Sequence, residues 1–158
     1  MPWSSTYFVS PRSQNQKDVS SSAGHSLMDN HPFSMDRYVI ANKNTSALKI
    51  ILEKGDLFAF CELVEKEAMM LHSLMMTSSP SYVLMKPQTL EIMNEIKAFR
   101  NMNKVPVCFT LDAGANVHVL YPEKDSKSVT DFINSKLSKY CFQAKFIMDH
   151  VGKGPQII

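Results

Sequence analysis

The sequence predicts an α+β fold: an antiparallel sheet with helices on one face and an appended hairpin of two helices. The hydrophobic patterns follow the order helix, helix, helix, strand, strand, helix, strand. One more strand before the third helix would complete β-α-β-β-α-β, the ferredoxin-like order. The length of 158 residues, with 44% hydrophobic and 20% charged residues, suits one globular domain.

The first segment is polar. Residues 1–16 are rich in Ser, Pro, Gln and Asn without a hydrophobic period, so we expect a poorly ordered lead-in there and one domain over residues 17–158. Tyr7–Val9 has the composition of a remnant edge strand, which Pro11 would end. Val19–His25 then places serines before a glycine. Such serines are typical of a linker or helix cap and also of an anion site, and the local pattern leaves these interpretations open.

Two helices are expected next. The first runs from Asp36 to about Lys54, where Gly55 ends it, and Asp56 caps the second. The first helix has four apolar residues on one side, at Ile40, Ala47, Leu48 and Ile51. The second has the clearest helical period in the chain, at Leu57, Phe60, Cys61, Val64, Ala68, Leu71 and Met75.

Polar residues of the second helix are expected away from this apolar stripe. Glu62, Glu65 and Lys66 fall on its other faces. His72 lies near the end of the helix, where a single histidine is more typical of a structural or surface residue than of a ligand. Thr77–Pro80 stops the helix.

The remaining elements complete the pattern. Tyr82–Met85 is a short apolar run, and either it or an upstream segment would supply the missing strand. Pro87 opens a third helix that continues to about Asn101. Two strands, one helix with an apolar face and a last strand follow, at Val105–Leu111, Val117–Tyr121, Asp125 to Leu137 and Cys141–Met148.

A small turn joins the two middle strands. It contains one carboxylate, Asp112, followed by Ala113, Gly114, Ala115 and Asn116. Glycine permits a close approach by a ligand, and a carboxylate at a strand end can meet a substrate. Asp and Gly are also the ordinary residues of a solvated hairpin turn. The local pattern leaves both interpretations open.

Charge and cysteine content limit the function classes. A net charge of +2 gives no argument for nucleic acid or an anionic membrane as a partner. No apolar run approaches the ~20 residues of a transmembrane helix, and the start lacks the features of a signal peptide. Three distant cysteines favour reduced thiols in the cytoplasm over disulfides or a zinc site, and the histidines show no ligand spacing.

Three motifs resemble those of mevalonate diphosphate decarboxylases, a branch of the superfamily of galactokinase, homoserine kinase, mevalonate kinase and phosphomevalonate kinase (GHMP). Thr110–Asn116 resembles the family's Thr-(Phe/Leu)-Asp-Ala-Gly-Pro-Asn turn. Val19–His25 resembles its Val-Ser-Ser-(Arg/Thr)-x-Gly-Met motif, and His72–Pro80 resembles its His-Ala-x-x-x-x-(Thr/Ser)-x-x-Pro run. The resemblance covers about residues 17–155 and implies the fold of a GHMP C-terminal domain.

The resemblance implies an ATP-dependent decarboxylation. In the family, ATP phosphorylates the tertiary hydroxyl of mevalonate 5-diphosphate, and loss of phosphate and CO₂ then gives isopentenyl diphosphate. Asp112 would be the base that takes the hydroxyl proton, and Ala113 and Gly114 would keep the turn small enough for the substrate. Ser21 and Ser22 match positions that contact the substrate's diphosphate.

Other parts of the active site would come from outside this chain. The family's N-terminal domain carries a Gly/Ser-rich ATP-phosphate loop that is not found in this sequence, so we expect that domain to bind most of the ATP and Mg²⁺. The resemblance also suggests a homodimer for the full-length enzyme. The isolated chain is expected to be inactive.

Two departures concern the site directly. Ser22 stands where the family has Arg or Thr, so it can donate to a phosphate without adding charge, and Ala115 replaces the usual proline. Two other functions stay open. One is a GHMP small-molecule kinase domain, although such kinases usually lack an aspartate in this turn. The other is a ferredoxin-like domain that only binds a partner or ligand.

Overall fold

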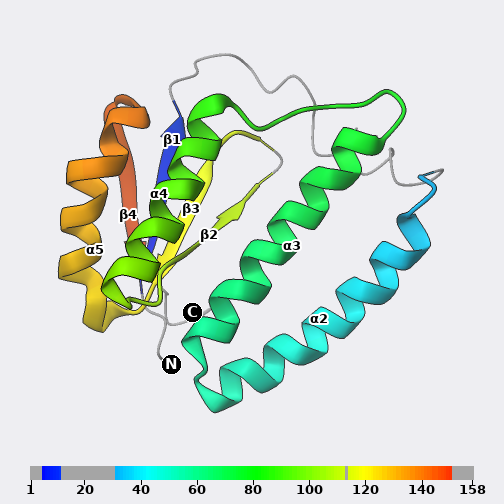
Figure 1. Cartoon of the computed structure of the whole chain (residues 1–158), viewed down its shortest axis with the longest axis horizontal. Coiled ribbons are helices and arrows are strands. Elements are labelled where there is room, and N and C mark those ends of the chain that lie inside the picture. The colour runs from blue at the N-terminus through cyan, green and yellow to red at the C-terminus, as the bar shows by residue number, and fades with distance from the viewer. Residues whose placement is uncertain (1–4, 12–30, 113, 151–158) are drawn as a thin grey trace, which may run out of the picture.

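The computed structural model describes residues 5–11, 31–112 and 114–150, which form an α+β fold (Figure 1). Their sheet has the strand order β2-β3-β1-β4, and every neighbouring pair is antiparallel. The strands are β1 (Ser5–Pro11), β2 (Cys108–Leu111), β3 (Val117–Tyr121) and β4 (Cys141–His150). Helix α4 (Pro87–Asn103) precedes β2, and α5 (Ser126–Phe132) lies between β3 and β4. This arrangement confirms the predicted ferredoxin-like sheet.

Strand β1 is the element that sequence patterns placed wrongly. Residues 5–11 form a strand, so the prediction of a poorly ordered lead-in is wrong for this part of residues 1–16. β1 is also central, because it pairs with β3 on one side and β4 on the other. Tyr82–Met85 is not a strand. The helical hairpin therefore lies between β1 and α4 in the chain, rather than in front of the fold.

The predicted hairpin is confirmed as α2 (Ser34–Lys54) and α3 (Leu57–Thr77). Gly55 ends α2 in the left-handed conformation, with φ of 69°, where a side chain would be strained. Asp56 caps α3, since its Oδ1 accepts a hydrogen bond from the Ala59 N–H at 3.0 Å. Helix α3 lies beside β2, the edge strand, and α2 packs on the outer side of α3 (Figure 1).

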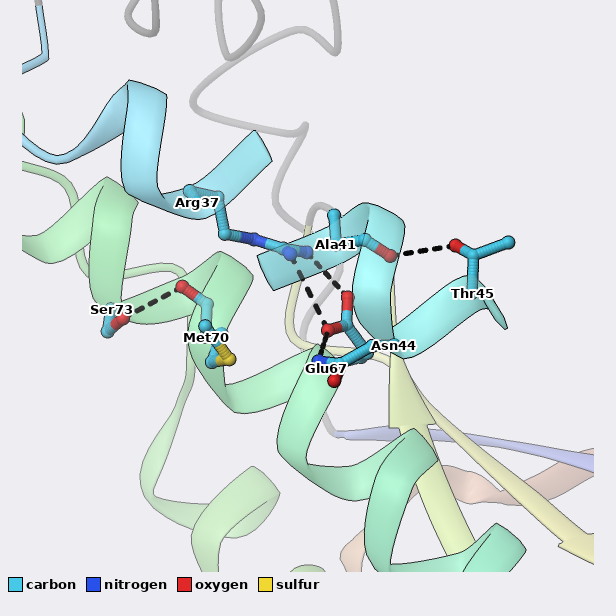
Figure 2. Close-up of polar contacts among 7 residues, drawn as sticks. All are labelled: Arg37, Ala41, Asn44, Thr45, Glu67, Met70 and Ser73. Carbon is cyan, nitrogen blue, oxygen red and sulfur yellow. Dashed lines mark hydrogen bonds and ion pairs between the residues drawn. The ribbon is translucent and has the colours of Figure 1, made fainter. Parts of the chain in front are cut away.

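A polar cluster joins α2 to α3. Arg37 Nη2 lies 2.7 Å from Glu67 Oε2, and Asn44 also donates to the Glu67 carboxylate, as Figure 2 shows. The predicted apolar face of α2 is only half-buried, at Ile40, Ala47, Leu48 and Ile51. The outer helix is thus held by a charged contact as well as by modest apolar burial.

The main core lies between the sheet and helices α4 and α5. Its side chains come from the predicted inward faces of α4 and the last helix and from the sheet, with Ile92 and Ile96 of α4, Val107, Phe109, Leu111, Val117, Val119 and Tyr121 around the sheet, and Val129, Phe132, Ile133 and Leu137. Phe99 stacks on Phe132 with 4.2 Å between ring centroids. The last helix continues past α5 as a π-helical segment over Ile133–Leu137.

Glu65 lies on a buried face of α3, which corrects its predicted place on a face outside the apolar stripe. It retains only 7% exposure and forms a bidentate ion pair with Arg100 of α4, with N···O distances of 2.6 and 3.0 Å. Arg100 also donates to the Val107 carbonyl, and the Phe109 N–H donates to Glu65. Hydrogen bonding to Glu65 raises the pKa of Arg100. This pair therefore ties α3, α4 and the start of β2 together.

All three cysteines carry free, buried thiols, which agrees with the prediction of reduced cysteines. The pKa of the Cys108 thiol on β2 is raised well above its usual value, because the neutral thiol donates a hydrogen bond to Cys61 on α3 and is buried. In the described part of the chain, no helix combines the length and apolar character needed to cross a membrane.

Candidate active site

The candidate site is the turn Asp112–Asn116, which joins β2 to β3. Leu111 and Val117 form the last residue pair of the two strands, and both are buried. Asp112 follows directly after β2 and is half-buried, with its Oδ1 atom inside the protein. The paired end of β2 thus fixes the backbone position of Asp112, while part of the residue stays accessible to solvent.

His72 of α3 holds the first residue of the turn. Its Nε2 lies 3.0 Å from the backbone carbonyl oxygen of Asp112, and the imidazole is only 1% exposed. Because a carbonyl oxygen only accepts hydrogen bonds, Nε2 must carry the proton. His72 is therefore a buried hydrogen-bond donor to the backbone of the candidate base.

Thr89 of α4 holds the other end of the turn. Its hydroxyl donates to the Ala115 carbonyl at 2.9 Å and accepts from the Lys86 N–H at 3.1 Å. The side chain is fully buried. One hydroxyl thus caps the first turn of α4 and joins that helix to the candidate site.

Two histidines define the electrostatic surroundings of Asp112. Burial lowers the pKa of His72 below its usual value, although the hydrogen bond to the Asp112 backbone and the charge of Asp112 oppose this shift. Burial also lowers the pKa of His118 on β3, again against the charge of Asp112. Burial therefore shifts both imidazoles toward the neutral form and works against an imidazolium beside the Asp112 carboxylate.

The structure describes only some of the predicted site residues. Asp112 and Gly114 lie in the same turn, and both are half-buried. Ala113, Ser21 and Ser22 lie outside the described residues, as does the rest of Val19–His25. The geometry between the aspartate turn and the serine motif therefore stays a prediction.

Sequence patterns missed the contacts that support the turn. His72 stands 40 positions before Asp112, and Thr89 stands 26 positions before Ala115. Thr89 has a local signal, because it is the third residue of a helix that opens with Pro87. His72 belongs to one of the three motifs, but its partner could be found only from the packing of α3 beside β2.

Comparison with known proteins assigns this chain. Solved structures with the same fold include the mevalonate pyrophosphate decarboxylase of Streptococcus pyogenes, with a TM-score of 0.85 and 20% identity over 98% of this chain and 46% of that one. They also include the mevalonate diphosphate decarboxylase of Enterococcus faecalis, studied for ATP binding mediated by mevalonate diphosphate, with a TM-score of 0.78 and 20% identity over 93% of this chain and 42% of that one. Residues 8–151 match the family Mevalonate 5-diphosphate decarboxylase C-terminal domain, and the chain belongs to this family.

A curated relative has a related name. The phosphomevalonate decarboxylase of Haloferax volcanii is 29% identical over 105 residues, which cover 66% of this chain and 32% of that protein. This chain thus spans less than half the length of the proteins that it matches.

The fit of a metal ion can be judged for the described residues. They contain no group of three His, Cys, Asp or Glu side chains that could hold one. A solved relative in complex with MVAPP, AMPPCP and magnesium matches 93% of this chain and 43% of its own, with 22% identity and a TM-score of 0.80.

Proposed function

We propose that this chain supplies the catalytic aspartate of an ATP-dependent mevalonate 5-diphosphate decarboxylase. The observation that carries the proposal is the position of Asp112, a half-buried carboxylate at a strand end in a turn of small residues. Membership of the decarboxylase family supports it. The reaction converts ATP and mevalonate 5-diphosphate to isopentenyl diphosphate, CO₂, ADP and phosphate.

The chemistry explains the need for a carboxylate. A tertiary alcohol is a weak nucleophile, so a base within hydrogen-bond reach that takes its proton is worth about 10²–10⁴-fold in rate. In the proposed step, Asp112 accepts the hydroxyl proton while the hydroxyl oxygen attacks the terminal phosphorus of ATP and ADP leaves. Phosphate and CO₂ then depart, and the electrons of the carbon–carboxylate bond form the double bond of the product.

The remaining contacts are assigned by the same proposal. Ser21 and Ser22 contact the substrate's diphosphate, and Ala113 and Gly114 leave room for the substrate beside Asp112. ATP and Mg²⁺ bind mainly to the portion that the longer relatives possess outside the matched region. We also propose a cytoplasmic enzyme that forms a homodimer at full length, with no nucleic-acid or membrane partner.

Mevalonate 5-phosphate is a second candidate substrate, and the similarity to the Haloferax volcanii enzyme favours it. Its tertiary alcohol and carboxylate are the same, so Asp112 would act identically. The two substrates differ by one phosphate group. Ser22 stands where the family has Arg or Thr and brings no positive charge. In this proposal it is the position that distinguishes a substrate with one phosphate group from a substrate with two.

A hybrid enzyme tests the proposal. This chain replaces the matching portion of the Streptococcus pyogenes enzyme, and CO₂ release and ADP formation are measured with ATP, Mg²⁺ and either substrate. Asp112→Asn should lower kcat by about 10²–10⁴-fold while ATP still binds. Asp131→Asn is the matched control, because the Asp131 side chain is 68% exposed on α5 and pairs with Lys127 one helical turn away. Equal turnover of the two variants would remove Asp112 from the mechanism.

A further inference from the structure

The candidate turn is held at both ends by side chains from two different helices. His72 of α3 donates to the carbonyl of Asp112, and Thr89 of α4 donates to the carbonyl of Ala115. Both donors are buried, with exposures of 1% and 0%. Both bonds go to backbone carbonyl oxygens, so they restrain the main chain of the turn at Asp112 and at Ala115.

The helices that carry these donors are themselves fixed. The ion pair between Glu65 of α3 and Arg100 of α4 joins the two helices, and Glu65 also accepts from the Phe109 N–H on β2. The donors are therefore carried by helices that are joined to each other and to β2. If the turn moved, a buried donor and a carbonyl oxygen would each lose a hydrogen-bond partner, which costs free energy. The two hydrogen bonds therefore resist displacement of the turn.

We propose that His72 and Thr89 are positioning residues that fix Asp112 for proton transfer. The proposal rests on the function proposed above, and it adds two residues that act through the backbone of the turn, at Asp112 and at Ala115. A misplacement of about 1 Å at a reacting group can cost about 10²-fold in rate. Free movement of a five-residue turn would allow such displacements.

Conservative variants separate donation from packing. His72→Gln places an amide N–H near the position of Nε2, whereas His72→Leu keeps the volume but removes the donor. Thr89→Ser keeps the hydroxyl, and Thr89→Val removes it at almost unchanged shape. His31→Leu is the matched control, because His31 is also a buried histidine, 5% exposed, but its ring nitrogens bond Thr77 Oγ1 of α3 at 3.1 Å and the Phe33 N–H at 3.1 Å.

The first measurement needs no activity. Hydrogen exchange of the Leu111–Val117 amides is followed in the 158-residue chain. His72→Leu and Thr89→Val should speed exchange there by roughly threefold to tenfold, the range expected for one lost hydrogen bond. His72→Gln, Thr89→Ser and His31→Leu should leave it unchanged. Unchanged exchange in a folded His72→Leu or Thr89→Val chain would overturn the proposal, and if one variant does not fold, the other decides.

The second measurement is kinetic and uses the hybrid enzyme. His72→Leu and Thr89→Val should lower kcat by about 10- to 100-fold with the KM for ATP unchanged, and His72→Gln and Thr89→Ser should restore it. Full kcat in His72→Leu, in an enzyme that Asp112→Asn inactivates, would also overturn the proposal. If the hybrid has no activity, the proposed function fails, and exchange alone still decides whether these side chains hold the turn.

Discussion

The stability of the candidate site depends on the protonation of the two histidines near Asp112, His72 and His118. His72 can donate to the Asp112 carbonyl as a neutral ring, and its burial opposes a second proton on Nδ1. His118 is half-buried near the same charge and is also shifted toward the neutral form. These two residues link the integrity of the turn to pH.

The free energy of unfolding should therefore fall as the pH is lowered below about 6.5, the usual histidine pKa. The unfolded chain takes up protons on both imidazoles near that pH, while the folded chain does so only at lower pH. The stability from these groups is complete above pH 6.5 and is lost as the pH falls through the lowered pKa values. Urea unfolding at a series of pH values measures this.

Substitution identifies the groups responsible. His72→Gln should reduce the slope of unfolding free energy against pH, and His118→Gln should reduce it further. An unaltered slope in the double variant would show that other groups carry the dependence.

At the scale of the element, α3 connects the separate parts of the fold. Glu65 and His72 are seven residues apart, which is about two helical turns, so both lie on the same side of the helix. One meets Arg100 and the other meets Asp112. The ion pair thus holds α3 beside the edge strand β2, and in this position His72 reaches the carbonyl of Asp112.

Loss of the Glu65 carboxylate should be strongly destabilising. Glu65→Ala leaves the guanidinium of Arg100, which is 13% exposed, without its ion-pair partner, and we expect a loss of about 3–5 kcal/mol in the free energy of unfolding. Asp131→Asn removes the exposed Lys127 pair and should change it by less than about 1 kcal/mol. Urea denaturation of both variants compares the two pairs, and equal small shifts would contradict the structural role of Glu65.

Helix α3 also shows why a sequence predicts some contacts and not others. Its apolar period, its Asp56 cap and the Gly55 stop depend on neighbours in the chain, so these features were predictable. Glu65 was placed away from the apolar stripe because a carboxylate is normally solvated, and only Arg100, 35 residues later, makes its burial tolerable. The Asp112 turn was predictable as a candidate, whereas its support by His72 and Thr89 depends on tertiary packing.

At the scale of the whole molecule, β1 completes the sheet. The seven residues of β1 lie between strands β3 and β4 in the sheet. Their pairing partners are more than 100 positions away in the sequence, as in the pair Ser5–Tyr121. A short segment that Pro11 ends resembles an edge remnant in sequence, because no local pattern reveals partners so distant. The order of the later elements nevertheless predicted one more strand before the third helix, at Tyr82–Met85 or upstream, and β1 is that strand in the upstream position.

Removal of residues 1–11 should prevent cooperative folding, because both β3 and β4 lose a paired neighbour. The truncated chain is expected to show no sharp thermal unfolding transition by circular dichroism. A synthetic peptide of residues 1–12, added in excess, should restore the transition by binding in place of β1. A native-like transition without the peptide would show that β1 is dispensable.

The place of β1 also has a consequence for synthesis on the ribosome. Residues 5–11 are translated long before their partners at residues 117–121, and at about 5–20 residues per second the interval is on the order of ten seconds. During that time the backbone of this segment lacks the neighbours that it has in the finished sheet. A chaperone that binds short extended segments would meet its best target in the nascent chain there, before β3 emerges.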